Sequence, residues 1–294
     1  MKKRIRKVRV NGDVYIVKAV RTRFWKPGTD YIGEIIKSLR RIRVKSGDLV
    51  FISEKAISTA KGHIVDEEKV EAGLVAKLIA RIWMRYAWGY LWGPASRLRK
   101  DTINFLRNYP LDYGARHKQV ALQYAGFLRA LCFGSEGGID CSNLPYAYVC
   151  IPLPDADKES YEIKNAIAEK LGAKVGVILL DSDRCYRWWK FWISTRPVKF
   201  KEVKEFGGFA TYLISNFLKL RDSPTPIAVA GVHFKMDRMY KLLKAVDEVR
   251  GYGAGRNVWE MAEKFQTSLT GVTWEMLEKI PHYPIVVARK VKNK

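Results

Sequence analysis

The ten residues 134–143 carry a dense set of side chains that could do chemistry. They comprise three glycines, two carboxylates, two serines, one asparagine, one cysteine and one isoleucine. Glycine lets the backbone approach a ligand closely or take a positive φ. The oxygens of Asp140, Ser142 and Asn143 are of the kind that a hard divalent cation prefers. The alternative is a tight turn between two apolar segments, because Gly and Asp are also ordinary turn residues.

A second acidic stretch follows a predicted buried strand. Residues 175–180 are apolar apart from Gly176, and Asp181, Ser182 and Asp183 come directly after them. Such a run is typical of a buried strand, and ligand-binding groups collect at the carboxyl ends of strands in folds that mix strands and helices. Asp140 and Asp181 are therefore the first candidates for a shared metal site.

The composition favours a globular protein with phosphate-bearing partners. The 294 residues suffice for one large or two medium domains, and 48% hydrophobic residues can supply a core. The formal net charge of +23 favours nucleotides, nucleic acids or anionic membranes as partners. The alternative is a solvated surface rich in lysine and arginine.

The cysteines indicate a reducing setting. Cys132, Cys141, Cys150 and Cys185 contain no C-x-x-C pair, so a zinc site is not expected. No apolar secretion segment follows the first residues, and a cytoplasmic location is the simplest expectation. No window of about 18 uncharged apolar residues occurs, so no membrane span is expected.

The pattern along the chain predicts both strands and helices. Residues 4–10 and 13–20 alternate around Asn11-Gly12, which predicts a β-hairpin with a type I′ turn. Residues 117–133 are expected to form strand and turn, 206–220 a helix, 226–232 a buried strand, and 251–255 a flexible link between helices. The predicted fold class is α+β, with mixed β-sheets and packed helices.

The region 67–92 predicts an added helical segment that is both aromatic and basic. Lys77, Arg81 and Arg85 recur every four residues and would form one ridge. Interleaved cations and rings could stack bases or a flavin-like ring, or lie on a membrane surface. Rings at this spacing are otherwise typical of a core or a subunit interface. The rings concerned are Trp83, Tyr86, Trp88, Tyr90 and Trp92.

Three segments in order resemble the coenzyme F-420-0:gamma-glutamyl ligase family. They are GDLVFISEKAISTAKG at 47–62, GIDCSN at 138–143 and KVGVILLDS at 174–182. The resemblance covers roughly residues 15–65 and 130–235. It implies a gamma-glutamyl-ligase-like fold and a GTP-dependent amide ligase of coenzyme F-420 biosynthesis, in which a carboxylate is activated as an acyl phosphate and the amine of glutamate attacks it.

The resemblance also implies partners and roles for single residues. Expected are Mg²⁺ or Mn²⁺, a monovalent cation, GTP as co-substrate, a phosphorylated small-molecule substrate and a homodimer. Asp140, Asp181 and Ser182 would be metal ligands. Arg184 and Arg187 would be catalytic anion clamps, or else ordinary surface arginines. The nucleotide-binding positions would be Phe24, Trp25 and Lys26, where the family has a hydrophobic-Lys segment, together with Glu54, Lys55 and Asn143.

The sequence departs from the family pattern at several positions. Thr59 and Lys61 replace a lysine and an acidic residue, and residues 219–225 replace a glycine-rich acidic loop. Two other functions therefore stand beside the ligase. One is a paralogue that binds a phosphorylated small molecule without ligating it, and the other is a basic nucleic-acid-binding protein on the same fold, whose binding would fall steeply with salt.

The expected domain organisation has three parts. Residues 1–66 and 117–235 would form the ligase-like α+β core, and residues 67–116 a helical insertion. Residues 236–294 would form a C-terminal helical extension with a final strand.

Overall fold

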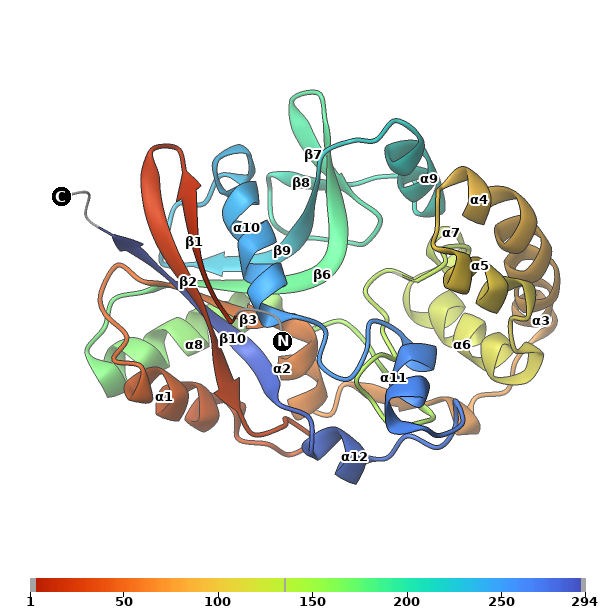
Figure 1. Cartoon of the computed structure of the whole chain (residues 1–294), viewed down its shortest axis with the longest axis horizontal. Coiled ribbons are helices and arrows are strands. Elements are labelled where there is room, and N and C mark those ends of the chain that lie inside the picture. The colour runs from red at the N-terminus through yellow and green to blue at the C-terminus, as the bar shows by residue number, and fades with distance from the viewer. Residues whose placement is uncertain (1–3, 135, 292–294) are drawn as a thin grey trace.

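The computed structural model describes residues 4–134 and 136–291, so Ser135 of the glycine-rich stretch lies outside the described residues. Within these ranges a mixed sheet of eight strands has the order β1-β2-β10-β3-β6-β7-β8, with β9 paired to β6 (Figure 1). The strands are β1 Ile5–Val10, β2 Asp13–Thr22, β3 Leu49–Ser53, β6 Gly176–Trp188, β7 Phe191–Ser194, β8 Val203–Glu205, β9 Asp222–Ala230 and β10 His282–Val291. A separate pair joins β4 Ile64–Asp66 to β5 Tyr148–Cys150.

The predicted amino-terminal hairpin is confirmed. β1 pairs antiparallel with β2, and the two turn residues have positive φ, 49° at Asn11 and 86° at Gly12. Two successive left-handed residues define the type I′ turn, which matches the twist of the flanking strands.

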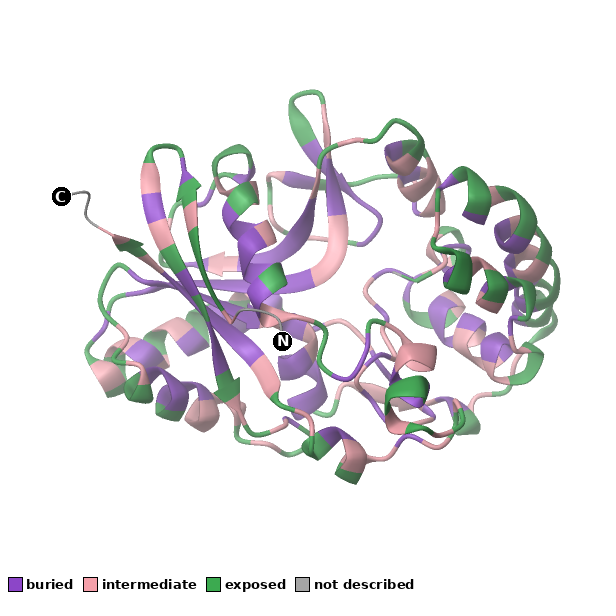
Figure 2. Ribbon diagram, viewed as in Figure 1, coloured by how far each residue is buried: buried purple, intermediate pink, exposed green. Residues whose placement is uncertain are grey.

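Helices cover both faces of the sheet, as the burial pattern of Figure 2 shows. On β3, Val50 and Ile52 pack with α1 Tyr31–Arg41 and α8 Ala156–Leu171. Leu49 and Phe51, which alternate with them, pack with α10 Met236–Arg250. Because side chains alternate across a strand, a continuous apolar run serves two cores. The predicted α+β class with a mixed sheet and packed helices is confirmed.

A helical segment beside the sheet has its own core. It comprises η1 Glu67–Lys69, α3 Leu74–Leu78, the π-helix η2 Ile79–Trp92, α4 Gly93–Ala95, α5 Lys100–Arg107, α6 Leu111–Tyr124 and α7 Phe127–Ala130. Trp83 and Trp88 each donate a 2.8 Å hydrogen bond to the Leu131 carbonyl, and Trp88 is fully buried. These two rings therefore belong to a core.

The prediction of strand and turn for 117–133 is wrong. Residues 117–124 lie in α6 and 127–130 in α7. The buried face of α6 includes Gly114, Ala115 and Lys118. Because these residues are small or charged, the sequence does not show the regular spacing of apolar residues that is typical of a helix. The expected boundary at residue 116 falls inside α6.

The carboxyl-terminal part is integral to the sheet. β10 lies between β2 and β3, so the final strand completes the core instead of extending it. The preceding helices are α10, α11 Val258–Phe265 and α12 Trp274–Glu278, and α2 Glu54–Ala60 and α9 Phe209–Phe217 complete the set described. β9 begins at Asp222, so part of the predicted 219–225 loop is strand. No helix in the described ranges is long and apolar enough to cross a membrane.

Candidate active site

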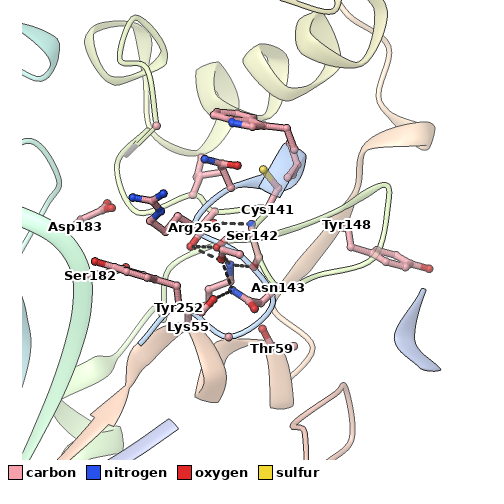
Figure 3. A pocket seen from close by; sticks show the side chains of 18 of the residues that line it. Lys55, Thr59, Cys141, Ser142, Asn143, Tyr148, Ser182, Asp183, Tyr252 and Arg256 are labelled. Carbon is pink, nitrogen blue, oxygen red and sulfur yellow. Dashed lines mark hydrogen bonds and ion pairs between the residues drawn. The ribbon is translucent and has the colours of Figure 1, made fainter. Parts of the chain in front are cut away.

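A cavity of about 540 Å³ lies between the sheet and the helical segment. Its walls include α2, the loop at 139–148, β6, α5, α6 and the segment 250–259. Ser182 and Asp183 lie on the β6 side and Tyr148 on the opposite side, with Ser142, Asn143 and Arg256 between them (Figure 3).

Two parallel strands deliver polar groups to this cavity. β3 ends at Ser53, which pairs with Leu180 of β6. β6 continues past that point without β3 but still paired with β9, and its register with β9 shifts between Asp181 and Arg184. Asp181, Ser182 and Asp183 therefore lie beyond the end of β3 and line the cavity. The expectation that the strand ends at Asp181 is corrected, since β6 runs on to Trp188.

The loop that carries Asp140 is tied to α2 by a lysine. The Asp140 carboxylate accepts hydrogen bonds from the Ser142 backbone N–H at 2.7 Å and from its hydroxyl at 3.1 Å. Lys55 Nζ lies 2.9 Å from Asp140 Oδ2 and also donates to the Ser142 carbonyl. Lys55 and Asp140 are respectively 18% and 37% exposed, so this pair faces the cavity and remains open to a ligand.

The other predicted metal ligand, Asp181, is paired with a buried arginine. Arg196 Nη1 donates to Asp181 Oδ2 and to Glu54 Oε2, the latter at 3.1 Å. Glu54 Oε1 accepts a 2.9 Å hydrogen bond from the Leu153 backbone N–H. Glu54, predicted as a nucleotide contact, is 2% exposed and lies behind the cavity wall.

A protein-held divalent metal does not fit this donor set. Asp140 is opposed by Lys55 and Asp181 by Arg196, so each carboxylate already faces a cation of the chain. Among the described residues no group of three His, Cys, Asp or Glu side chains is arranged to hold a metal ion. A cation needs several free oxygen ligands that converge on it.

The predicted catalytic arginines lie away from the cavity. Arg184 pairs with Asp247 at 3.1 Å and with Asp222 at 3.6 Å. Arg187 pairs with Asp237 at 2.8 Å. Neither is among the residues that line the cavity, and their role as anion clamps stays a prediction.

Of the predicted nucleotide-binding residues 24–26, two line the cavity and one does not. Phe24 and Trp25 line the cavity, Phe24 with its ring centroid 4.8 Å from that of His282. Lys26 lies outside the lining and pairs with Glu278 at 2.6 Å. Burial lowers the pKa of His282 to about 4, so this ring is neutral at pH 7.

Thr59 and Lys61, which depart from the family pattern in the first motif, both contact other parts of the fold. The Thr59 hydroxyl donates to Cys150 Sγ at 3.8 Å, and Lys61 pairs with Glu159 at 2.6 Å. Thr59 still lines the cavity. The positive charge that the family pattern places at this position is therefore absent here.

Asn143 is hydrogen-bonded to residues 252–255, which form a cavity wall that the sequence pattern did not indicate. Its Nδ2 donates to the carbonyls of Tyr252 and Gly255, both at 3.1 Å, and its Oδ1 accepts from the Ala254 N–H at 2.6 Å. A Cβ at Gly253 would lie 2.3 Å from Asn143 Oδ1. The predicted flexible link 251–255 is thus a wall of the cavity. The only signal for it was its three glycines.

A second group of charges lies on the helical side. His117 Nδ1 is 2.7 Å from Glu67 and its Nε2 is 3.6 Å from Glu136, while Lys118 Nζ lies 2.7 Å from Glu136. Burial alone would lower the pKa of His117, but the two carboxylates outweigh it and raise the pKa to about 10. His117 is therefore a cation at pH 7.

Aromatic rings supply much of the remaining wall. Phe105 and Trp259 are stacked with centroids 4.0 Å apart, and Phe133 stacks on Trp259 at 6.3 Å. All three line the cavity, as does Tyr109. Rings beside lysine and arginine suit a ligand that carries both a planar group and negative charge.

Comparison with known proteins finds relatives of this chain. The chain is 32% identical over 292 residues to an uncharacterized protein of Methanocaldococcus jannaschii, covering 92% of this chain and 94% of that protein. Two proteins named coenzyme F420:L-glutamate ligase are more distant. The one from Archaeoglobus fulgidus is 28% identical over 166 residues, 55% of this chain and 57% of that protein. The one from Methanopyrus kandleri is 24% identical over 157 residues, 53% of this chain and 55% of that protein.

The match to the named ligases spans just over half of their length. A family model described as F420-0:Gamma-glutamyl ligase matches residues 19–211, a range that includes both predicted motifs at Asp140 and Asp181. The chain therefore belongs to the F420-0:gamma-glutamyl ligase family, and this membership supports a ligase function.

Proposed function

We propose that this chain is a GTP-dependent amide ligase that joins glutamate to a carboxylate of a phosphorylated small molecule. The observation that supports the proposal best is the meeting of three distant motifs in one cavity. Lys55 of the first motif is 2.9 Å from Asp140 of the second, and both line the cavity together with Asp181 and Ser182 of the third.

The proposed reaction has two steps. A carboxylate oxygen attacks the γ-phosphorus of GTP, the bond to the β-phosphate oxygen breaks, and an acyl phosphate and GDP form. The glutamate amine then attacks the acyl carbon, the C–N bond forms, phosphate leaves, and the amine loses a proton. Such phosphoryl transfer depends mainly on positioning and on positive charge near the phosphates, which Lys55 would supply.

Metal ions enter the proposal with the nucleotide. Mg²⁺ or Mn²⁺ on the phosphates would neutralise developing charge, and a monovalent cation is part of the same expectation. Asn143 would act by holding the 252–255 wall against the nucleotide. The aromatic side of the cavity, with Phe105 and Trp259, would take the planar part of the substrate. The homodimer stays a prediction.

The test is a ligation assay with coenzyme F420-0, L-glutamate, GTP and Mn²⁺, read by mass spectrometry. A product that gains one glutamate residue, with one GDP released per product, is expected. Lys55→Met should lower the rate at least about tenfold, since a hydrogen bond to a charged group contributes about 1.5–3 kcal/mol. GTP turnover that needs no glutamate and gives no amide would contradict the proposal.

A further inference from the structure

Arg196 is a buried cation beside the sheet wall of the cavity. It follows β7, is 2% exposed and lies within hydrogen-bonding distance of two carboxylates. Its Nη1 and Nη2 are 3.1 and 3.3 Å from the two oxygens of Glu54, and Nη1 also donates to Asp181. One guanidinium thus joins the end of β3 to β6.

The glycine loop is shaped around this guanidinium. Gly138 has φ +93°, and a Cβ there would lie 2.4 Å from Arg196 Cζ and 2.7 Å from both of its terminal nitrogens. Any larger residue would collide with a buried charged group. The backbone two residues before Asp140 therefore packs directly on Arg196.

A guanidinium in this position is a permanent charge. Burial alone would lower the pKa of Arg196, but the nearby carboxylates of Glu54, Asp181 and Asp183 outweigh it and raise the pKa. Its planar fork matches two carboxylates at once and does not deprotonate in proteins. A metal ion that bound Asp181 and Glu54 would have to displace this arginine from a buried site, leaving its charge without partners.

We propose that Arg196 is a built-in cation that, between Glu54 and Asp181, takes the place of a divalent metal at Asp181, one of the three predicted metal ligands. Arg196 is then a positioning residue, because it touches neither the cavity nor a ligand and acts by fixing Asp181 and the Asp140 loop. This goes beyond the proposed function. It concerns the resting protein, whether or not the chain ligates glutamate.

The test is a titration of the full chain with Mn²⁺ alone, following free Mn²⁺ by electron paramagnetic resonance. The wild type should bind Mn²⁺ no more tightly than Asp181→Asn does. Arg196→Gln removes one positive charge from beside two carboxylates and should bind Mn²⁺ about a hundredfold more tightly than the wild type, or more. Arg196→Lys keeps the charge and should behave like the wild type.

Two further measurements distinguish cation replacement from general damage. Mn²⁺ should raise the melting temperature of Arg196→Gln but not of the wild type, because a ligand that binds only the folded state stabilises it. Adding Asp181→Asn to Arg196→Gln should abolish both effects. If Arg196→Gln does not fold, the comparison of Mn²⁺ binding by the wild type and by Asp181→Asn tests the proposal.

Wild-type Mn²⁺ binding that is lost in Asp181→Asn would overturn the proposal. A folded Arg196→Gln that binds Mn²⁺ no better than the wild type would also overturn it. Neither result depends on ligase activity, since no nucleotide or substrate is present.

Discussion

The sheet wall and the helical wall of the cavity both pair cations with carboxylates, but they differ in what they leave accessible. On the sheet wall, Lys55 and Asp140 form a partly exposed pair in front of the buried Arg196. On the helical wall, Lys118 is 0% exposed and its partner Glu136 is 5% exposed. The sheet wall can exchange partners with a ligand, whereas the helical wall is closed.

This difference assigns different tasks to similar groups. A buried ion pair that loses one member leaves an uncompensated charge in a poorly solvated place, so the helical wall is expected to govern stability. A partly exposed lysine can move from a carboxylate to a phosphate at little cost, so Lys55 is expected to govern binding.

The largest effect is expected from Lys118→Met. The change keeps the volume of the side chain and removes the ammonium from Glu136, so the free energy of unfolding should fall by about 3–5 kcal/mol. Urea denaturation followed by circular dichroism measures this. Lys77→Met is the matched control, because Lys77 is exposed and such changes usually stay within about 0.5 kcal/mol. Equal stability of the two variants would contradict the expectation that the helical wall governs stability.

The helical wall should also make stability fall in alkali. Because the pKa of His117 is raised to about 10, its contribution is complete below the unfolded pKa near 6.5 and is lost as the pH rises through 10. Between about pH 7 and 8.5, below the ordinary pKa of thiols, the free energy of unfolding should fall by about 1 kcal/mol per pH unit. Equilibrium denaturation should show this slope in the wild type and not in His117→Gln.

The same wall should weaken in acid for the opposite reason. Burial alone would raise the pKa of Glu136, but Lys118 and His117 outweigh it and lower the pKa to about 2. The contribution of Glu136 is therefore complete above the unfolded value of 4.5 and is lost as the pH falls toward 2. In denaturation at about pH 3 the loss should be smaller in Glu136→Gln than in the wild type.

A smaller and more local effect is expected at Asn143. Asn143 has φ 55°, a conformation that glycine adopts without strain. Asn143→Gly therefore removes only the side-chain amide, whereas Asn143→Ala also adds backbone strain. Losing these hydrogen bonds should cost about 1–2 kcal/mol. Hydrogen exchange of the Ala254 amide should be faster in both variants. Unchanged exchange in Asn143→Gly would mean that the 252–255 wall does not depend on this side chain.

Much of the fold could be predicted because local rules and global structure agree there. Asn11-Gly12 requires positive φ at both positions, and the hairpin forms around it. The apolar run before Asp181 is a strand buried on both faces, parallel to β3. Lys55, Asp140, Asn143 and Asp181 were all predicted as site residues, and all line the cavity.

The missed parts depend on contacts between residues far apart in the chain. Arg196 lies 142 residues from Glu54, and Asn143 lies 109 residues from Tyr252, so no local pattern links them. Helix α6 was missed because its buried face carries Lys118, a residue that is almost never fully buried unless paired. Its partner Glu136 could not be recognised before the fold brought the two together.

The most direct test of the central claim is calorimetric titration of GTP and Mg²⁺ into the wild type, Lys55→Met and Lys170→Met. Both variants lose one lysine, but Lys170 is an exposed residue of α8 outside the cavity. The account predicts that GTP binds to the wild type and to Lys170→Met alike, and at least about tenfold more weakly to Lys55→Met. No GTP binding, or binding that Lys55→Met leaves unchanged, would contradict it.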